Sequence, residues 1–275
     1  MNILKFFGVI TVVILMLSCS GDDSVASEAV IEFSPKSYHF KNMDYPIGMV
    51  MSPTLDNLVK ISYDVSNKIT KRIGGIVYYS AGSGSGTGFT NEIYDELIYS
   101  SNQIKINRKT SFTSYSIYDF ERKLILDNNN RIVRKFVYQE NAVYPNPTND
   151  TINYFYNSLG QISETFKGDL DLYNEKTKFY YNGNGNLDSI VLKKHYQDEP
   201  YYSKTKEVFS NFDNIPNPMK KLIIFEETFN RALSKNNYSK YEKFTYDSSN
   251  NLINTEFRNW TLQYDSSGNI NFNLY

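Results

Sequence analysis

A short sequence template occurs six times along the chain and constrains its fold more than any other feature. Each copy begins with an aromatic residue (once Leu), continues with Asp or Asn, has Gly or Asn three residues later, and ends on Ile or Leu. The copies are YDVSNKI from Tyr63, LDNNNRI from Leu126, YNSLGQI from Tyr156, YNGNGNL from Tyr181, YDSSNNL from Tyr246 and YDSSGNI from Tyr264, with a degenerate copy, FDNIPNP, from Phe212. A recurring unit calls for a modular interpretation of the whole chain.

The residue types of the template are those of a tight turn between two strands. An Asp or Asn side chain can bond to the backbone two residues on, and Gly or Asn tolerates the left-handed backbone that a tight hairpin requires. The aromatic residue then ends the incoming strand, and Ile or Leu begins the outgoing one. The predicted turn positions are Asp64, Asn67, Asp127, Asn130, Asn157, Gly160, Asn182, Gly185, Asp247, Asn250, Asp265 and Gly268.

The remaining sequence also favours strands. The chain contains 24 Tyr and 18 Phe, and runs of about five to eight residues with alternating or apolar character recur between Asn, Asp, Gly, Ser and Pro. Such runs include LDSIVLKKHY at 187–196, KKLIIFEETF at 220–229 and WTLQYD at 260–265, whereas the best helical candidate is a turn or two in NRALSKNN at 230–237. We predict an all-β fold, a large curved antiparallel sheet built as a meander of hairpins; the pattern leaves open whether the sheet closes into a barrel.

The template resembles the tyrosine–aspartate (Rhs-type) repeat, whose core is similar to YDSSGNI. More closely, residues 60–275 resemble repeat-bearing lipoproteins of Bacteroidota, in which a "YD…PNP" element occurs, here FDNIPNPMKKL. The resemblance implies a large, curved antiparallel sheet wrapped toward a barrel-like shell. It implies no catalytic residues, because such families mostly lack an assigned activity.

The N-terminal segment is expected to be a targeting signal. Residues 1–18 carry a lone charge at Lys5 followed by an apolar run from Phe6 to Leu17, which is short for a transmembrane helix and is typical of a secretory signal. Together with Cys19, the only cysteine, the segment resembles a bacterial lipoprotein signal with acylation of that cysteine. We therefore predict a signal peptide at 1–18, a lipidated tether at 19–30 and a β domain at 31–275, anchored at the outer membrane and exposed at the cell surface.

No motif in the chain specifies a reaction. The formal net charge of −1 gives no basic face for nucleic acid, and His39 and His195, the only histidines, are not in a metal-ligand spacing. GSGSG at 82–86 matches a nucleophile elbow or a phosphate loop only formally, because no helix is predicted after it, and a mobile hairpin loop is expected there. The turn copies lack the spaced carboxylates of a calcium loop. We predict neither a metal nor a cofactor.

Three adjacent pairs of acidic residues are the remaining catalytic candidates: Asp95/Glu96, Asp198/Glu199 and Glu226/Glu227. Neighbours in a strand point to opposite faces, so no pair forms an acid/base dyad by itself. The leading hypothesis is a non-catalytic binding or structural module with a glycan or protein ligand, of unspecified oligomeric state. The alternative is a carbohydrate-active hydrolase. The alternating C-terminal NINFNLY would suit an outer-membrane barrel, but charges scattered through the strands argue against a lipid-facing surface.

Overall fold

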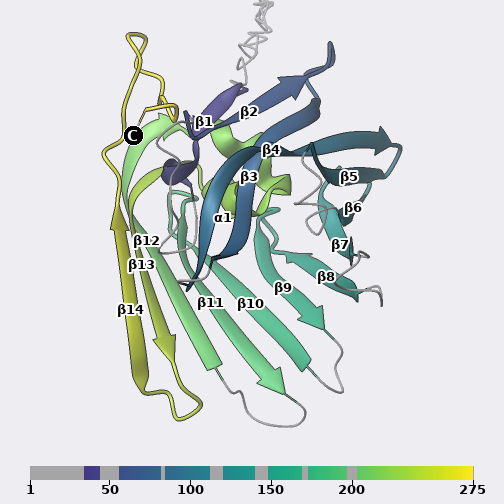
Figure 1. Ribbon diagram of the computed structural model, residues 1–275. Coiled ribbons are helices and arrows are strands. Elements are labelled where there is room, and N and C mark those ends of the chain that lie inside the picture. The colour runs from purple at the N-terminus through teal and green to yellow at the C-terminus, as the bar shows by residue number, and fades with distance from the viewer. Residues whose placement is uncertain are drawn as a thin grey trace, which may run out of the picture. The chain divides into compact units, whose positions relative to one another are not determined.

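The computed structural model describes residues 34–43, 56–81, 84–111, 120–139, 148–168, 173–196 and 203–274. In these ranges, fourteen strands form one sheet whose spatial order equals the chain order, with every neighbour antiparallel (Figure 1). The strands are β1 Ser37–His39, β2 Leu58–Tyr63, β3 Ile69–Ala81, β4 Gly84–Ser100, β5 Gln103–Thr110, β6 Phe120–Leu126, β7 Ile132–Gln139, β8 Thr148–Tyr156, β9 Ile162–Gly168, β10 Tyr173–Tyr181, β11 Leu187–Tyr196, β12 Ser203–Pro216, β13 Asn236–Tyr246 and β14 Leu252–Asn259. The predicted all-β meander of hairpins is confirmed.

The two ends of the sheet are joined without a strand ladder. Among the described residues, β1 and β14 each have one strand neighbour, so the sheet is not closed by backbone pairing. Instead, the His39 N–H donates to the Phe272 carbonyl at 2.6 Å, and the Asn42 side-chain amide donates to the same carbonyl at 2.8 Å. The Trp260 indole N–H donates to the Lys41 carbonyl at 2.7 Å. The C-terminal residues thus hold the N-terminal edge of the sheet.

The connection between β12 and β13 is a helical insertion where a strand was predicted. Residues 220–229 alternate enough to resemble a strand, but they belong to the 3-10 helix η3 (Pro218–Ile224) and the α-helix α1 (Glu226–Ala232). The Asn217 side chain accepts a hydrogen bond from the Met219 N–H at 2.9 Å, and Pro218 stands in the first turn, where its missing N–H costs nothing. The helical candidate at 230–237 is correct only for its first three residues.

Two further sequence expectations were wrong. The glycine–serine segment was expected as a mobile hairpin loop, but residues 84–88 belong to β4 and pair with β3, with Ala81 opposite Gly84 and Val77 opposite Gly88; residues 82 and 83 lie outside the described residues. WTLQYD at 260–265 contains no strand and contributes only an isolated bridge from Tyr264 to Ile270. The edge strand β14 immediately before it carries exposed Ile253 and Phe257, so its sequence lacks the usual alternation of buried and exposed residues.

The hydrophobic core lies between the inner face of the sheet and η3–α1. One buried cluster joins β1–β7 to Met219, Leu222 and Phe225, and a second joins β9–β13 to Trp260, with Phe229 of α1 packed against it. Strands from both halves of the sheet therefore contact the same short insertion, and the sheet curves around it (Figure 1).

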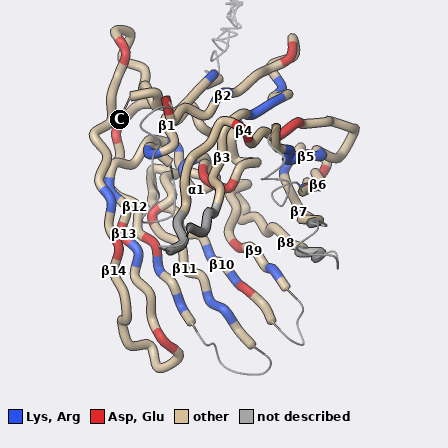
Figure 2. Tube along the Cα trace, in the orientation of Figure 1, with Lys and Arg blue, Asp and Glu red and all other residues tan. Residues whose placement is uncertain are grey.

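Residues of both charge signs are spread along the strands (Figure 2), and the outer face of the sheet also exposes apolar side chains such as Ile98, Phe155 and Tyr180. Cross-strand ion pairs join Lys105 to Glu121 at 2.5 Å, Lys109 to Glu96 at 2.8 Å, and Lys176 to Glu164 at 3.0 Å. Ion pairs between exposed side chains are solvated, and each contributes little to the stability of the fold. In the described part of the chain, no helix has the length and hydropathy of a membrane span.

Candidate ligand-binding cavity

The six template copies adopt one turn geometry, which explains why they share their residue types. In each copy the Asp or Asn N–H donates to the carbonyl four residues on at 2.8–3.0 Å, and the N–H of the Gly or Asn three residues on donates back at 3.0 Å. That Gly or Asn has a positive φ in every copy, at Asn67, Asn130, Gly160, Gly185, Asn250 and Gly268. Each copy of the template therefore forms a tight turn of the same kind.

The acidic or amide side chain of each turn is occupied by the turn itself. The Asp127 Oδ1 accepts from the N–H groups of Asn129 and Arg131, each at 2.9 Å, and its Oδ2 accepts from the Arg131 Nε at 2.8 Å. These hydrogen bonds, first among them that from the Arg131 backbone, lower the pKa of the Asp127 carboxyl. Asn157, Asn182 and Asp265 make the same two backbone contacts. The turns need no cation to hold their shape.

The template tyrosine has a second role that its position in the sequence did not reveal. The Tyr156 hydroxyl donates to the Ile132 carbonyl at 2.7 Å, and the Tyr181 hydroxyl donates to the Ile162 carbonyl at 3.0 Å. In both cases the acceptor is the last residue of the preceding copy. The tyrosine of one hairpin is thus tied to the turn of the hairpin before it.

The topology of the meander places α1 on the side of the sheet where most of these turns lie. Successive connections in a meander alternate between the two sides at which the strands end. The connections that follow even-numbered strands therefore share one side; they are the turns at 64–68, 127–131, 157–161 and 182–186 and the η3–α1 insertion, whereas the turn at 247–251 lies on the other side. The insertion occupies the place of a hairpin turn, and it begins in the degenerate copy at Phe212.

The degenerate copy holds the base of this insertion. The Asp213 Oδ1 accepts from the Ile215 N–H at 3.2 Å, much as the other turns do, but also from the Asn237 N–H at 2.9 Å on the returning strand. The Asn217 side-chain amide donates to the carbonyls of Arg231 at 2.6 Å and Ser234 at 3.0 Å, which end the helix. The Pro and Asn residues that distinguish this copy therefore start and close the insertion.

A buried ionic network fixes α1 against the inner face of the sheet. Asp95, fully buried on β4, accepts from Arg72 at 3.1 Å and from the Arg108 Nε at 3.0 Å, and it lies 2.8 Å from the Arg122 Nη2. Although burial acts in the opposite direction, these guanidiniums hold the pKa of Asp95 well below its usual range. Arg72 also pairs with Glu227 of α1. Three arginines from neighbouring strands thus converge on one carboxylate beneath the helix.

The other end of the helix is fixed by a buried arginine in an aromatic enclosure. Arg231 is fully buried, and its Nη1 donates to the Tyr238 carbonyl at 3.0 Å. Its guanidinium lies over the rings of Tyr238 at 4.0 Å, Trp260 at 5.1 Å and Phe272 at 5.2 Å. Cation–π contacts of this kind stabilise a desolvated arginine, so buried charged groups contact the sheet from both ends of α1.

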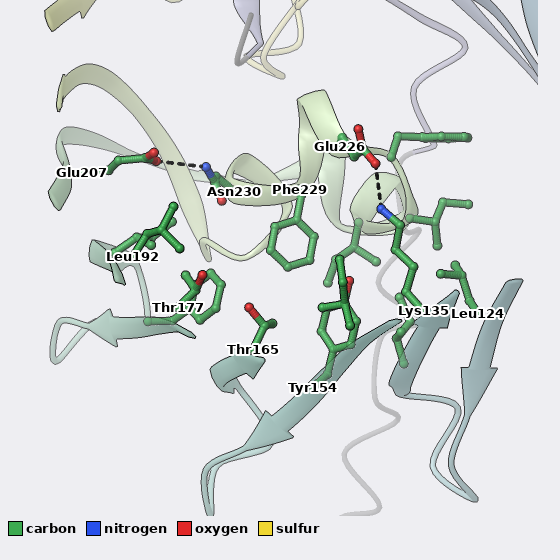
Figure 3. Close-up of a pocket in the computed structure, with 17 residues that line it drawn as sticks. Leu124, Lys135, Tyr154, Thr165, Thr177, Leu192, Glu207, Glu226, Phe229 and Asn230 are labelled. Atoms are coloured by element: carbon green, nitrogen blue, oxygen red, sulfur yellow. Dashed lines mark hydrogen bonds and ion pairs between the residues drawn. The ribbon is translucent and has the colours of Figure 1, made fainter. Parts of the chain in front are cut away.

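Between α1 and strands β6–β12 lies a cavity of about 320 Å³ (Figure 3). Its walls are mainly aliphatic and aromatic, and its polar groups are few. The lining residues are Leu124, Ile132, Lys135, Ile152, Tyr154, Thr165, Thr177, Phe179, Ile190, Leu192, Glu207, Ile223, Ile224, Phe225, Glu226, Phe229 and Asn230. A mostly apolar cavity of this size with a few polar groups is the usual form of a small-molecule site.

The strand register brings these side chains onto one face. Tyr154 lies opposite Thr165, Thr165 opposite Thr177, and Thr177 opposite Leu192, so one row crosses four strands. A second row places Phe179 opposite Ile190 and Ile190 opposite Glu207. Because neighbours in register point to the same side, both rows face α1.

The aromatic rings in the cavity are packed against one another. Phe229 projects from α1 into the cavity (Figure 3), and its ring meets that of Tyr154 at 6.2 Å and 64° and that of Phe179 at 6.0 Å and 71°. Phe229 is thus packed edge to face against both neighbouring rings.

Two carboxylates line the cavity on opposite sides of Phe229 (Figure 3). The Lys135 ammonium donates to the Glu226 Oε1 at 2.7 Å, and the Asn230 side-chain amide donates to the Glu207 Oε2 at 3.3 Å. The Glu226 side chain is 70% exposed, whereas Lys135 is only 9% exposed. The charge of Lys135 lowers the pKa of Glu226 to about 2, so this carboxyl is ionised at neutral pH.

The other sequence candidates do not gather at this cavity. His39 lies in β1 beside η1 (Phe40–Asn42), where burial lowers its pKa, and His195 lies in β11, far from it in the sheet order. Asp95 points inward and Glu96 outward, as adjacent strand residues should. Glu226 and Glu227 share the first turn of α1 rather than a strand. Cys19, Asp198 and Glu199 are outside the described residues.

The chain offers no metal centre in its described part, where no three His, Cys, Asp or Glu side chains gather suitably. The residues that sequence reasoning missed are Lys135, Glu207 and Phe229. Lys135 and Glu207 stand in strands among many charged residues of similar spacing, and no local signal separates them. Phe229 fell in a stretch predicted as a strand, although Pro218 after an Asn marked a helical start.

Comparison with known proteins gives no family. No protein-family model and no curated protein matches the chain, so its resemblance to tyrosine–aspartate repeats stays a prediction. Among solved structures, the chain is similar to a porin-like protein from Bacteroides vulgatus ATCC 8482, with 11% identity, a TM-score of 0.49, and coverage of 78% of this chain and 85% of that one. A porin-like protein from Bacteroides uniformis ATCC 8492 has 10% identity, a TM-score of 0.45, and coverage of 78% and 80%. Likenesses at this level establish neither a shared function nor a shared location.

Proposed function

We propose that the chain is a non-catalytic binding protein of the cell envelope, anchored by lipid at Cys19, whose ligand occupies the cavity between α1 and β6–β12. The cavity carries the proposal. It is apolar, it has a few convergent polar groups, and the helix that forms its roof is fixed at both ends by buried charges. A cavity that is already formed binds a ligand without the loss of conformational entropy that ordering its walls would require.

The alternative, a carbohydrate-active hydrolase, has one observation in its favour, because Glu207 and Glu226 both line the cavity. A glycosidase needs one carboxyl with a raised pKa to act as general acid. Glu226 has the opposite shift, because Lys135 holds it in the ionised form, so Glu226 does not fit the role of the acid. Sugars are also bound by stacking on ring faces, whereas Tyr154 and Phe179 are packed edge to face with Phe229. The binding protein is the better-supported reading.

Filling the cavity tests the proposal. We expect the full chain, purified from its producing cells, to carry a small molecule that organic extraction and mass spectrometry detect. Thr177→Trp places a large ring among the lining residues and should remove that molecule while leaving the thermal unfolding transition in place. Tyr180→Trp, at an exposed outward position three residues along the same strand, is the matched control. Identical extracts from Thr177→Trp and the unmodified chain would refute the cavity as the site.

The anchor has its own test. Cells that express the chain should incorporate a radioactive fatty acid into it, and the Cys19→Ala variant should incorporate none, since Cys19 is the only thiol. Protease treatment of intact cells then reports surface exposure. Equal labelling of the two proteins would contradict lipidation without affecting the cavity.

A further inference from the structure

We propose that the ligand of the cavity is an uncharged, mainly aliphatic molecule whose hydroxyl or carbonyl oxygens bond to a row of three side-chain hydroxyls on the sheet. This inference rests on the proposed binding function and adds the chemical class of the ligand. It follows from the placement of those hydroxyls and from the pairing of the charged groups around the cavity.

Tyr154, Thr165 and Thr177 form the hydroxyl row, one on each of the neighbouring strands β8, β9 and β10. Tyr154 stands opposite Thr165, and Thr165 stands opposite Thr177, so the three side chains point to the same face of the sheet. All three line the cavity beneath α1 (Figure 3). Because neighbouring strands are about 4.8 Å apart, the row crosses about 10 Å of the cavity wall.

The three hydroxyls of the row make no hydrogen bond to another residue in the described part of the chain. By contrast, the hydroxyls of the turn tyrosines Tyr156 and Tyr181 donate to backbone carbonyls. Burial raises the pKa of the Tyr154 hydroxyl well above its usual value, so this group keeps its proton and can donate. A hydroxyl both donates and accepts, and it is costly in apolar surroundings when it has no partner. The row therefore favours a ligand that supplies neutral hydrogen-bonding groups.

Lys135 and Glu226 are already paired, which disfavours a ligand ion of either sign. The Lys135 ammonium donates to Glu226 at 2.7 Å, and the Lys135 side chain is only 9% exposed. A ligand carboxylate would compete with Glu226 for this ammonium. A ligand amine would compete with Lys135 for Glu226, in the positive field of Arg122 and Arg108. An ion that finds no partner in an apolar cavity is strongly destabilised.

The remaining charged groups are paired as well. Glu207 accepts from the Asn230 side-chain amide at 3.3 Å and takes part in a further interaction of its own. Arg108 and Arg122 both pair with Asp95. The uncharged hydroxyl row is thus the polar surface that the described part of the cavity offers to a ligand.

The body of the ligand follows from the rest of the wall. Leu124, Ile132, Ile190, Leu192 and Ile223 contribute aliphatic surface to the cavity. An alkyl chain gains free energy in proportion to the apolar area that it buries against such surface. The wall therefore suits an aliphatic body, and the hydroxyl row suits its few oxygen atoms.

Three molecules of equal chain length test the absence of charge. Octanol, octanoate and octylamine are titrated by calorimetry at pH 7 into the full chain, in a nonionic detergent held at constant concentration. We expect octanol to bind at least about tenfold more tightly than either ion, because each ion loses its hydration without gaining an unpaired partner of opposite charge. Thr177→Trp, titrated in the same detergent, subtracts partition into micelles. A molecule retained from the producing cells raises all three apparent Kd values by the same factor, so it does not alter the ranking.

Two variants then assign the contact to the hydroxyl row. Tyr154→Phe and Thr165→Val each remove one hydroxyl with little change of shape. Each should weaken octanol binding about threefold or more, the effect of one neutral hydrogen bond, and should leave the binding of chlorooctane, which cannot donate, unchanged. A variant that only disturbed the cavity would weaken both probes. Tyr180→Phe, at an exposed side chain, is the control and should change neither.

The outcomes separate the two proposals. Octanoate or octylamine binding as tightly as octanol, with Thr177→Trp abolishing that binding, would overturn the uncharged ligand and keep the cavity as the site. The same holds if neither Tyr154→Phe nor Thr165→Val weakens octanol binding. The ranking on the unmodified protein needs no variant, so it stands even where a variant folds poorly.

The organic extract decides where a retained molecule blocks every probe. A neutral aliphatic molecule in that extract would support the inference, and an ionic one would overturn it. If no probe binds more to the unmodified chain than to Thr177→Trp, and the extracts of the two proteins are identical, the binding function fails as well.

Discussion

Replacing Asp95 by Asn is expected to be the most damaging single charge change in the sheet. The substitution keeps the size of the side chain but removes the charge that faces Arg72, Arg108 and Arg122. Asp95 is fully buried, and Arg72 and Arg122 are 1% and 2% exposed, so water cannot replace the lost partner. Removing one partner of a buried ion pair costs about 3–5 kcal/mol, because the remaining charges are left uncompensated.

The assay is equilibrium unfolding in urea, which leaves the ionic strength unchanged. With a urea dependence of about 3 kcal/mol per molar, typical of the upper range, the loss corresponds to a fall in the midpoint of about 1–1.7 M. The matched control is Glu96→Gln, one residue away. Its carboxylate meets Lys109 on the exposed face, where a pair contributes about 0–1 kcal/mol.

A second variant tests the reasoning about uncompensated charge. Arg122→Met removes one of three cations and leaves Asp95 with two, and the Nε of Arg122 has no hydrogen-bond partner. It should therefore cost less than Asp95→Asn. The reasoning is refuted if Asp95→Asn loses no more stability than Glu96→Gln, or if Arg122→Met is the worse of the two buried variants.

The same network sets the response to acid. The pKa of Asp95 is lowered in the folded chain, so its contribution to stability is complete above the unfolded value of about 3.9 and is lost as the pH falls below it. Glu226, with a pKa lowered to about 2, acts in the same window, but its exposure to solvent weakens its share. Urea midpoints at pH 7, 4 and 3 should fall steeply below pH 4, and less steeply in Asp95→Asn, which lacks that carboxyl. Parallel curves for the two proteins would contradict this.

The turn chemistry gives two smaller predictions with controls from the same hairpin. Gly185→Ala should lower the free energy of unfolding by about 1 kcal/mol, because Gly185 has a φ of +80°. Gly183→Ala should be nearly neutral, since its Cβ would meet nothing within 4 Å and its φ is not positive. Urea midpoints of the two variants measure the difference, and equal values would contradict the turn geometry. Tyr181→Phe should cost about 0.5–1.5 kcal/mol through loss of the hydrogen bond to Ile162, whereas Tyr180→Phe, at an exposed side chain, should change little. Thermal unfolding measures this pair, and a harmless Tyr181→Phe would show that the link between hairpins contributes nothing.

The sequence was informative wherever structure is decided over a few residues. The turns are local, since Asn182 and Gly185 need only each other and the intervening backbone, and a meander pairs each strand with its neighbour in the chain. The helix failed as a prediction because its apolar residues face a curved sheet on more than one side, which blurs the helical period. The cavity was beyond local patterns altogether. Leu124 and Glu226 stand about a hundred residues apart, and only the strand register brings them to one hollow.

The contact between Asn42 and Phe272 joins residues 230 positions apart, whereas nearly all other pairing in the sheet is between successive hairpins. Contacts between residues that are close in the sequence form fast, and contacts between residues far apart in the sequence form late. As the chain is synthesised, hairpins can add one after another behind an edge that stays open. The insertion that roofs the cavity emerges after twelve strands, and the residues that hold the first strand emerge later still. The inner face of this sheet is therefore accessible for most of the time that the chain takes to be made.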